Sequence, residues 1–188
     1  MTTLIAGLVL FLGMHSISIF AAPLRDSLAA KSELGWKAVY SVVSIAGFVL
    51  IIQGYAEARI GADVLYTTPR WLWHLAAFFM LPTFILFLAP YFPGRISTAA
   101  KHPQLVAVKL WAFGHLLING SVPDVLLFGS FLAWGVVDRI SMKRREQRKV
   151  PGMPKTAAND VIIVVLGLAL YAGTVFWFHE RFIGGHLI

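Results

Sequence analysis

Long stretches of apolar residues, separated by short polar segments, dominate the chain. A helix of about 18 or more apolar residues is long enough to cross a bilayer. Pro82 interrupts one stretch, where neighbouring helices can tolerate a kink. The pattern predicts an all-α integral membrane protein, a bundle of about six transmembrane helices with no soluble domain, forming one domain over residues 1–188. The six spans are predicted at residues 2–22, 35–56, 71–92, 103–120, 123–142 and 159–178.

Basic residues are distributed unevenly between the predicted loops. The chain has mean hydropathy +0.74 and net charge +7, and twelve of its 16 Lys and Arg residues fall in the first, third and fifth loops. Such an excess marks the cytoplasmic side of a membrane. We therefore expect a bacterial inner (plasma) membrane protein with both termini outside and a cytoplasmic basic linker at about 143–158. Basic loops that face anionic lipid explain the charge, so the expected partner is the lipid bilayer and not nucleic acid.

The chain contains no cysteine. This excludes disulfides, iron–sulfur clusters, thiolate-ligated haem and covalently attached c-type haem. Histidine, methionine and carboxylate side chains remain as metal ligands, and no clustered set of four suggests a structural zinc site.

Two of the six histidines, His15 and His115, lie well inside predicted spans. At 1.5 Å per residue, both fall within about 5 Å of the midplane of a bilayer core. An ionisable group at that depth is costly without a partner, so each is a functional candidate. Each could instead hydrogen-bond a neighbouring helix. Two facing imidazoles could also hold a haem iron, with Phe11 and Trp111, one turn before each histidine, packing near the macrocycle.

Several motifs resemble the NnrU family, and the resemblance covers nearly the whole chain. They are Gly13-Met14-His15-Ser16, Lys101-His102-Pro103-Gln104, the stretch 110–117 with its Trp-x-x-x-His spacing, and Asp138-Arg139. Bacterial members of this family are associated with denitrification and nitrogen-oxide metabolism. The family also includes the plant zeta-carotene isomerase, a membrane enzyme that uses haem b.

The resemblance implies a haem b iron with His15 and His115 as its ligands. It further implies redox or isomerase-like chemistry, as in a haem-dependent isomerase or oxidoreductase, on a small gas ligand such as nitric oxide or on an apolar substrate. The isomerase has a further histidine in the loop after its second helix. The corresponding stretch here, residues 57–61, contains none. The resemblance therefore implies haem binding more strongly than isomerisation.

Two other functions remain open at this point. One is a non-catalytic accessory protein for nitrogen-oxide reductases. The other is a membrane methyltransferase, because the motif at residues 101–104 is similar to one in isoprenylcysteine methyltransferase-like proteins. Those proteins carry paired glutamates downstream, whereas this chain has only Glu146 there. The sequence assigns no catalytic residue.

Overall fold

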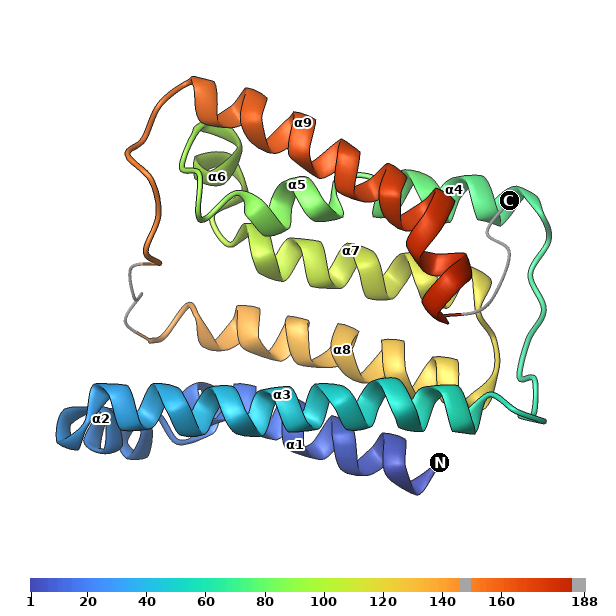
Figure 1. The fold of residues 1–188 in the computed structure, drawn as a ribbon, viewed down its shortest axis with the longest axis horizontal. Coiled ribbons are helices and arrows are strands. Elements are labelled where there is room, and N and C mark those ends of the chain that lie inside the picture. Colours follow the sequence, from blue (N-terminus) through green and yellow to red (C-terminus); the bar gives the residue numbers. More distant parts are fainter. Residues whose placement is uncertain (146–149, 184–188) are drawn as a thin grey trace. The chain divides into compact units, whose positions relative to one another are not determined.

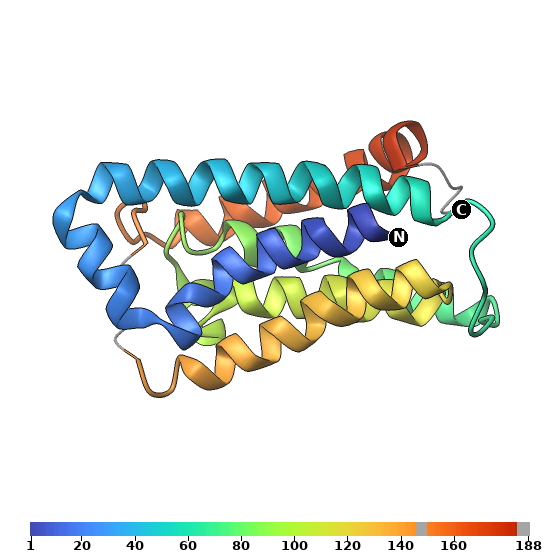
Figure 2. The ribbon, with the colours of Figure 1, turned by 90° about the horizontal axis from the view of Figure 1, so that it is seen from below.

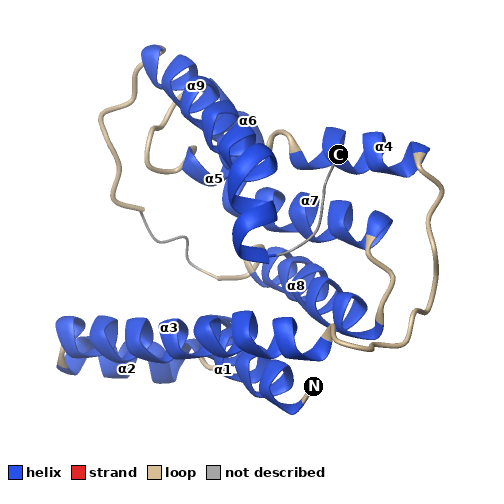
Figure 3. Cartoon of the chain, turned by 45° about the vertical axis from the view of Figure 1, so that its right-hand side comes forward, coloured by secondary structure: helices blue, strands red, loops and turns tan. Residues whose placement is uncertain are grey.

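The computed structural model describes residues 1–145 and 150–183 of the chain. In these residues the regular secondary structure is helical (Figure 3), with one isolated antiparallel bridge between Val64 and Ser121. The contacts divide the chain into two compact units, each of which is described by itself. The first comprises Met1–Thr67 and Asn119–Ser141, and the second comprises Thr68–Ile118 and Met142–Ile188.

The first unit is built from four helices (Figure 1): α1 (Thr2–Phe20), α2 (Ala22–Lys31), α3 (Glu33–Ala58) and α8 (Val122–Ser141). Helix α1 lies between α3 and α8 (Figure 2) and packs against both. Its buried side chains include Leu4 and Leu8, which are 0% and 5% exposed. Much of the remaining surface of α3 is apolar and exposed, as expected of a helix that faces lipid.

Close packing of α1 on α3 depends on glycines. A Cβ atom on Gly7 would lie 2.6 Å from the backbone nitrogen of Ile51, and one on Gly47 would lie 2.7 Å from the backbone nitrogen of Phe11. Gly54 is equally close to the backbone of Leu4. Small residues at such crossings let two helix backbones approach each other.

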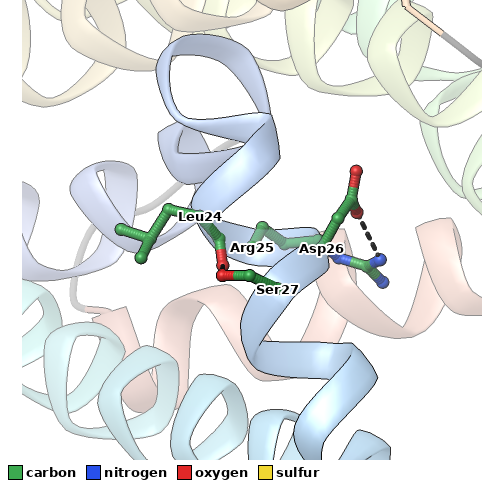
Figure 4. A network of polar contacts seen from close by, with 4 residues as sticks. All are labelled: Leu24, Arg25, Asp26 and Ser27. Atoms are coloured by element: carbon green, nitrogen blue, oxygen red, sulfur yellow. Dashed lines mark hydrogen bonds and ion pairs between the residues drawn. The ribbon is translucent and has the colours of Figure 1, made fainter.

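Helix α2 occupies the first predicted loop and was not predicted. Pro23 lies in its first turn, where the missing N–H group costs nothing. Figure 4 shows its local polar contacts: Arg25 Nη1 lies 2.9 Å from Asp26 Oδ1, and the Ser27 hydroxyl donates to the Leu24 carbonyl at 2.8 Å. All of these contacts are local, so they do not anchor α2 to other helices.

The second unit contains α4 (Trp71–Met80), α5 (Thr83–Leu88), α6 (Arg95–Ala100), α7 (Pro103–Ile118), α9 (Ala158–Gly173) and a π-helix, η1 (Thr174–Ile183). Helix α7 packs against α4 and α5, and α5 also packs against α9. The expected interruption at Pro82 is confirmed, because α4 ends before it and α5 begins after it.

The all-helical prediction is confirmed, whereas six spans are not confirmed by length and composition. Among the described residues, four helical segments are long and apolar enough to cross a membrane: Thr2–Phe20, Glu33–Ala58, Trp71–Leu88 and Ala158–His179. Helix α7 has 16 residues, and α8 carries Asp124, Asp138 and Arg139.

Part of the predicted basic linker, residues 146–149, lies outside the described residues. The part that follows is attached to the second unit rather than extended away from it. The Met153 amide donates to the Tyr91 carbonyl at 2.9 Å, and the Lys155 ammonium donates to the Thr98 hydroxyl at 3.1 Å. The segment before α9 is thereby held beside the turn around α6.

Candidate histidine sites

His15 is oriented by its own helix. Its Nδ1 lies 2.7 Å from the carbonyl oxygen of Phe11, one turn earlier in α1. A carbonyl can only accept, so Nδ1 carries the proton and Nε2 carries the lone pair. The Phe11 ring stacks on the imidazole, with centroids 4.2 Å apart and an angle of 26° between the planes. The sequence around His15 therefore fixes both its tautomer and the direction of its ring.

Aromatic rings from three helices surround His15. Tyr40 of α3 lies 5.2 Å from the imidazole, and Trp134 of α8 meets it at 6.0 Å with perpendicular ring planes. We call His15, Phe11, Tyr40 and Trp134 the His15 cluster. Phe131 of α8 extends it, with its ring 5.7 Å from that of Phe11. These rings provide a largely apolar environment for a neutral imidazole.

Two polar groups of α8 accompany the His15 cluster. The indole nitrogen of Trp134 is buried and has no hydrogen-bond partner. Asp138 follows one turn later and is 5% exposed, although it lies in an apolar helix. Its carboxylate is close enough to His15 and Tyr40 to act on both electrostatically. Buried donors without an acceptor are rare in folded proteins, so Trp134 requires an explanation.

His115, in the second unit, makes the same kind of Nδ1 hydrogen bond as His15. It lies in the last turn of α7, and its Nδ1 is 2.9 Å from the carbonyl oxygen of Trp111. Nδ1 is again the donor. The Trp111 ring lies 5.3 Å away, and the ring of His179 from η1 lies 6.4 Å away at an angle of 24°.

The structure places the two candidate ligands in different units, His15 in the first and His115 in the second. Each unit is described by itself, so their pairing stays a prediction. Phe11 and Trp111 each contact the histidine one turn later. Among the described residues, no three His, Cys, Asp or Glu side chains gather closely enough to hold a metal ion. A haem iron needs only two axial ligands from the protein, so the donor chemistry of two neutral imidazoles fits haem.

Comparison with known protein families gives a match over almost the entire chain: the model described as NnrU protein matches residues 3–186. The chain belongs to the NnrU protein family. Comparisons with curated proteins and with solved structures found no match.

This NnrU protein has a second buried polar group at the start of α8. Asp124 is 6% exposed and accepts from the Tyr55 hydroxyl at 2.6 Å, the Ser121 amide at 2.9 Å and the Ser121 hydroxyl at 2.5 Å. The Ser121–Asp124 pair caps α8, and Tyr55 links that cap to α3. Burial and the nearby Asp124 carboxylate raise the pKa of Tyr66, whose hydroxyl donates to the Asn119 carbonyl at 2.8 Å.

The sequence analysis of this NnrU protein missed three residues beside the candidate ligands: Tyr40, Trp134 and His179. Tyr40 lies within the predicted span 35–56 and His179 just after the predicted span 159–178, and neither position indicates a contact with a histidine. The structure puts His179 in a π-helix that continues α9 and turns its ring toward His115. A search for aromatic residues one or two turns from Asp138 would have found Trp134.

Proposed function

We propose that this NnrU protein binds haem b in a bacterial inner membrane, with His15 and His115 as the axial ligands. We further propose that it serves nitrogen-oxide metabolism through redox or isomerase-like chemistry. The observation that carries the proposal is the matched local geometry of the two histidines. In each, Nδ1 donates to the carbonyl of an aromatic residue four positions earlier.

This geometry prepares a histidine to ligate a metal. Metal-binding histidines usually donate their other ring N–H to a carbonyl or carboxylate, which fixes the tautomer and makes the ligating nitrogen more basic. In both His15 and His115 the bonded nitrogen is Nδ1, so Nε2 is the ligating atom. When bound, a bis-imidazole haem supplies one-electron chemistry or a coordination position for a small ligand.

The surrounding residues support the same function. Phe11 restricts the rotation of the His15 ring, and Tyr40 and Trp134 keep water away from it. The Trp111 ring lies beside His115 at 5.3 Å, tilted by 54°. These rings restrict the orientation of each imidazole, so little ordering is needed when a ligand binds.

We also propose that α7 and α8 cross the membrane, which gives six spans. In the first unit, the Leu65 amide donates to the Gly120 carbonyl at 2.8 Å and the Val122 amide donates to the Asp63 carbonyl at 3.0 Å. The loop after α3 and the loop before α8 must therefore lie on the same side of the membrane. In the second unit, the bond from Met153 to Tyr91 places the segment before α9 beside the segment after α5.

The span Trp71–Leu88 lies between these two bonded regions in the chain. The regions must therefore lie on opposite sides of the membrane. Helix α7 runs from the side of the segment after α5 to the side of the loop before α8. Helix α8 then returns to the side of the segment before α9. On this proposal each helix crosses, although α7 is short and α8 contains carboxylates. The short length of α7 is compatible with burial among other helices or with local thinning of the bilayer.

An absorption spectrum of the purified protein tests the haem proposal. We expect a Soret band, which His15→Ala and His115→Ala each weaken or shift. His74→Ala is the matched control, because His74 is exposed on α4, and it should leave the band unchanged. Added imidazole should restore the band in each alanine variant, which separates loss of a ligand from failure to fold. A protein without a Soret band, or a band that neither substitution changes, contradicts the proposal.

A further inference from the structure

We infer that the indole N–H of Trp134 binds a carboxylate of the group held at His15, a haem propionate. This inference rests on the proposed function and extends it to a residue that neither the motifs nor the family match assigns. It starts from a buried hydrogen-bond donor in the His15 cluster. The Trp134 nitrogen is buried and has no acceptor, although buried donors in folded proteins nearly always have one.

The nearest carboxylate does not satisfy this donor. Asp138 lies one helical turn from Trp134, but it is not the acceptor of the indole N–H. Ser141 donates to the Asp138 carbonyl at 3.1 Å and lies 3.5 Å from Asp138 Oδ1. The acceptor that Trp134 lacks is then a group of a molecule that binds beside His15.

The chemistry of haem limits what that acceptor can be. The four pyrrole nitrogens are occupied by the iron, and most of the macrocycle edge is hydrocarbon. The two propionate carboxylates are its only strong hydrogen-bond acceptors. The Trp134 ring lies 6.0 Å from the His15 ring and perpendicular to it. Of the groups on a haem held at His15, a propionate is therefore the one that the Trp134 N–H could bind.

The positions of Trp134 in α8 and His15 in α1 agree with a propionate that lies toward the cytoplasmic side. Trp134 lies seven residues before the end of α8 at Ser141, and His15 lies five residues before the end of α1 at Phe20. These offsets correspond to about 10 Å and about 8 Å of helix. Both ends lead into the basic loops predicted on the cytoplasmic side. Asp138, which is 5% exposed, would repel a second carboxylate, so the Trp134 N–H must offset that repulsion.

The test compares haem b with its dimethyl ester, which lacks the two carboxylates. Haem transfer from the full-length protein to excess apomyoglobin is timed for wild type, Trp134→Phe and the control Trp73→Phe. Trp73 lies on α4 in the second unit and is 37% exposed. We expect Trp134→Phe to release haem b roughly ten- to a hundred-fold faster, as for loss of a hydrogen bond to a charged group. It should release the ester at the wild-type rate.

Equal acceleration with haem b and with the ester would overturn the inference, because it would show that Trp134 only fills space. An unchanged haem b rate would also overturn it. If Trp134→Phe does not fold, benzothienylalanine at position 134 keeps the bicyclic ring, lacks the N–H group and gives the same two readouts. Failure of the proposed function is distinguishable, since wild type would then show no Soret band with either porphyrin.

Discussion

At the residue scale, Asp124 shows how a charged side chain is accommodated in an apolar helix. Its two carboxylate oxygens receive hydrogen bonds from Tyr55 and from the amide and hydroxyl of Ser121. Removal of the carboxylate leaves buried donors without an acceptor, which is costlier than the loss of an average hydrogen bond. The residue is therefore structural, in contrast to Asp138 beside His15.

We predict that Asp124→Ala lowers the free energy of unfolding by about 3 kcal/mol, because it removes a helix cap and an acceptor for a charged hydrogen bond. Tyr55→Phe removes a single donor and should cost about 1–2 kcal/mol. Thermal or denaturant unfolding in detergent measures both. The double variant should lower the free energy of unfolding by less than the sum of the two single losses, because both substitutions break the same hydrogen bond. Additive losses would contradict the network.

Sequence alone identified His15 and His115, because an ionisable side chain within an apolar span is conspicuous. It did not identify Trp134, because a tryptophan in a membrane helix usually indicates an interfacial position. The sequence also does not indicate that Asp124, at the start of the predicted span 123–142, is only 6% exposed. Which donor meets which acceptor depends on contacts between α3 and α8 that are far apart in the chain.

At the element scale, Gly7 and Gly13 provide a matched pair within α1. A Cβ on Gly7 would contact the backbone of α3, whereas a Cβ on Gly13 meets nothing within 4 Å. We predict that Gly7→Ala lowers the free energy of unfolding by about 2 kcal/mol, because the helices must separate. Gly13→Ala should be neutral or stabilising by about 0.5–1 kcal/mol, since alanine loses less backbone entropy in a helix.

Unfolding of the two variants in the same detergent checks this prediction. Equal effects at the two positions would contradict the close approach of α1 and α3. Gly173→Ala is a second control, because a Cβ there also meets nothing within 4 Å.

Apolar patterning predicted the helices well and their ends less well. The structure ends α1 at Phe20 and α7 at Ile118, two residues before each predicted end. The shorter α7 places His115 in a last turn, nearer the helix end than the sequence indicated. Helix α2 was missed because its apolar residues are too few to form a span. Helix ends are set by capping and by contacts such as those of Asp124, which hydropathy does not record.

At the scale of the whole molecule, the chain does not build its two compact units one after the other. Helix α8 follows α7 in sequence but packs in the first unit, against α1 and α3. The first unit therefore depends on a helix made after most of the second. Because hydropathy treats each helix separately, it does not indicate this arrangement.

The crossing of the membrane by α7 and α8 can be tested with single cysteines, because the natural chain has none. We predict that Ile60→Cys and Val122→Cys react with a membrane-impermeant thiol reagent added outside intact cells. Arg95→Cys and Lys143→Cys should react only in inverted vesicles.

Val122 is the decisive position, because only there do six and four spans place the residue on different sides. Labelling of Val122→Cys together with Lys143→Cys would restrict the protein to four crossings. Ile60, which is 85% exposed, is the positive control for reaction from outside, and Arg95→Cys controls for the seal of the cells. If Ile60→Cys and Val122→Cys are both labelled from outside, the hydrogen bonds that join residues 63–65 to residues 120–122 form on the outer side of the membrane. Helix α8, which contains Asp138 and Trp134, then crosses the bilayer.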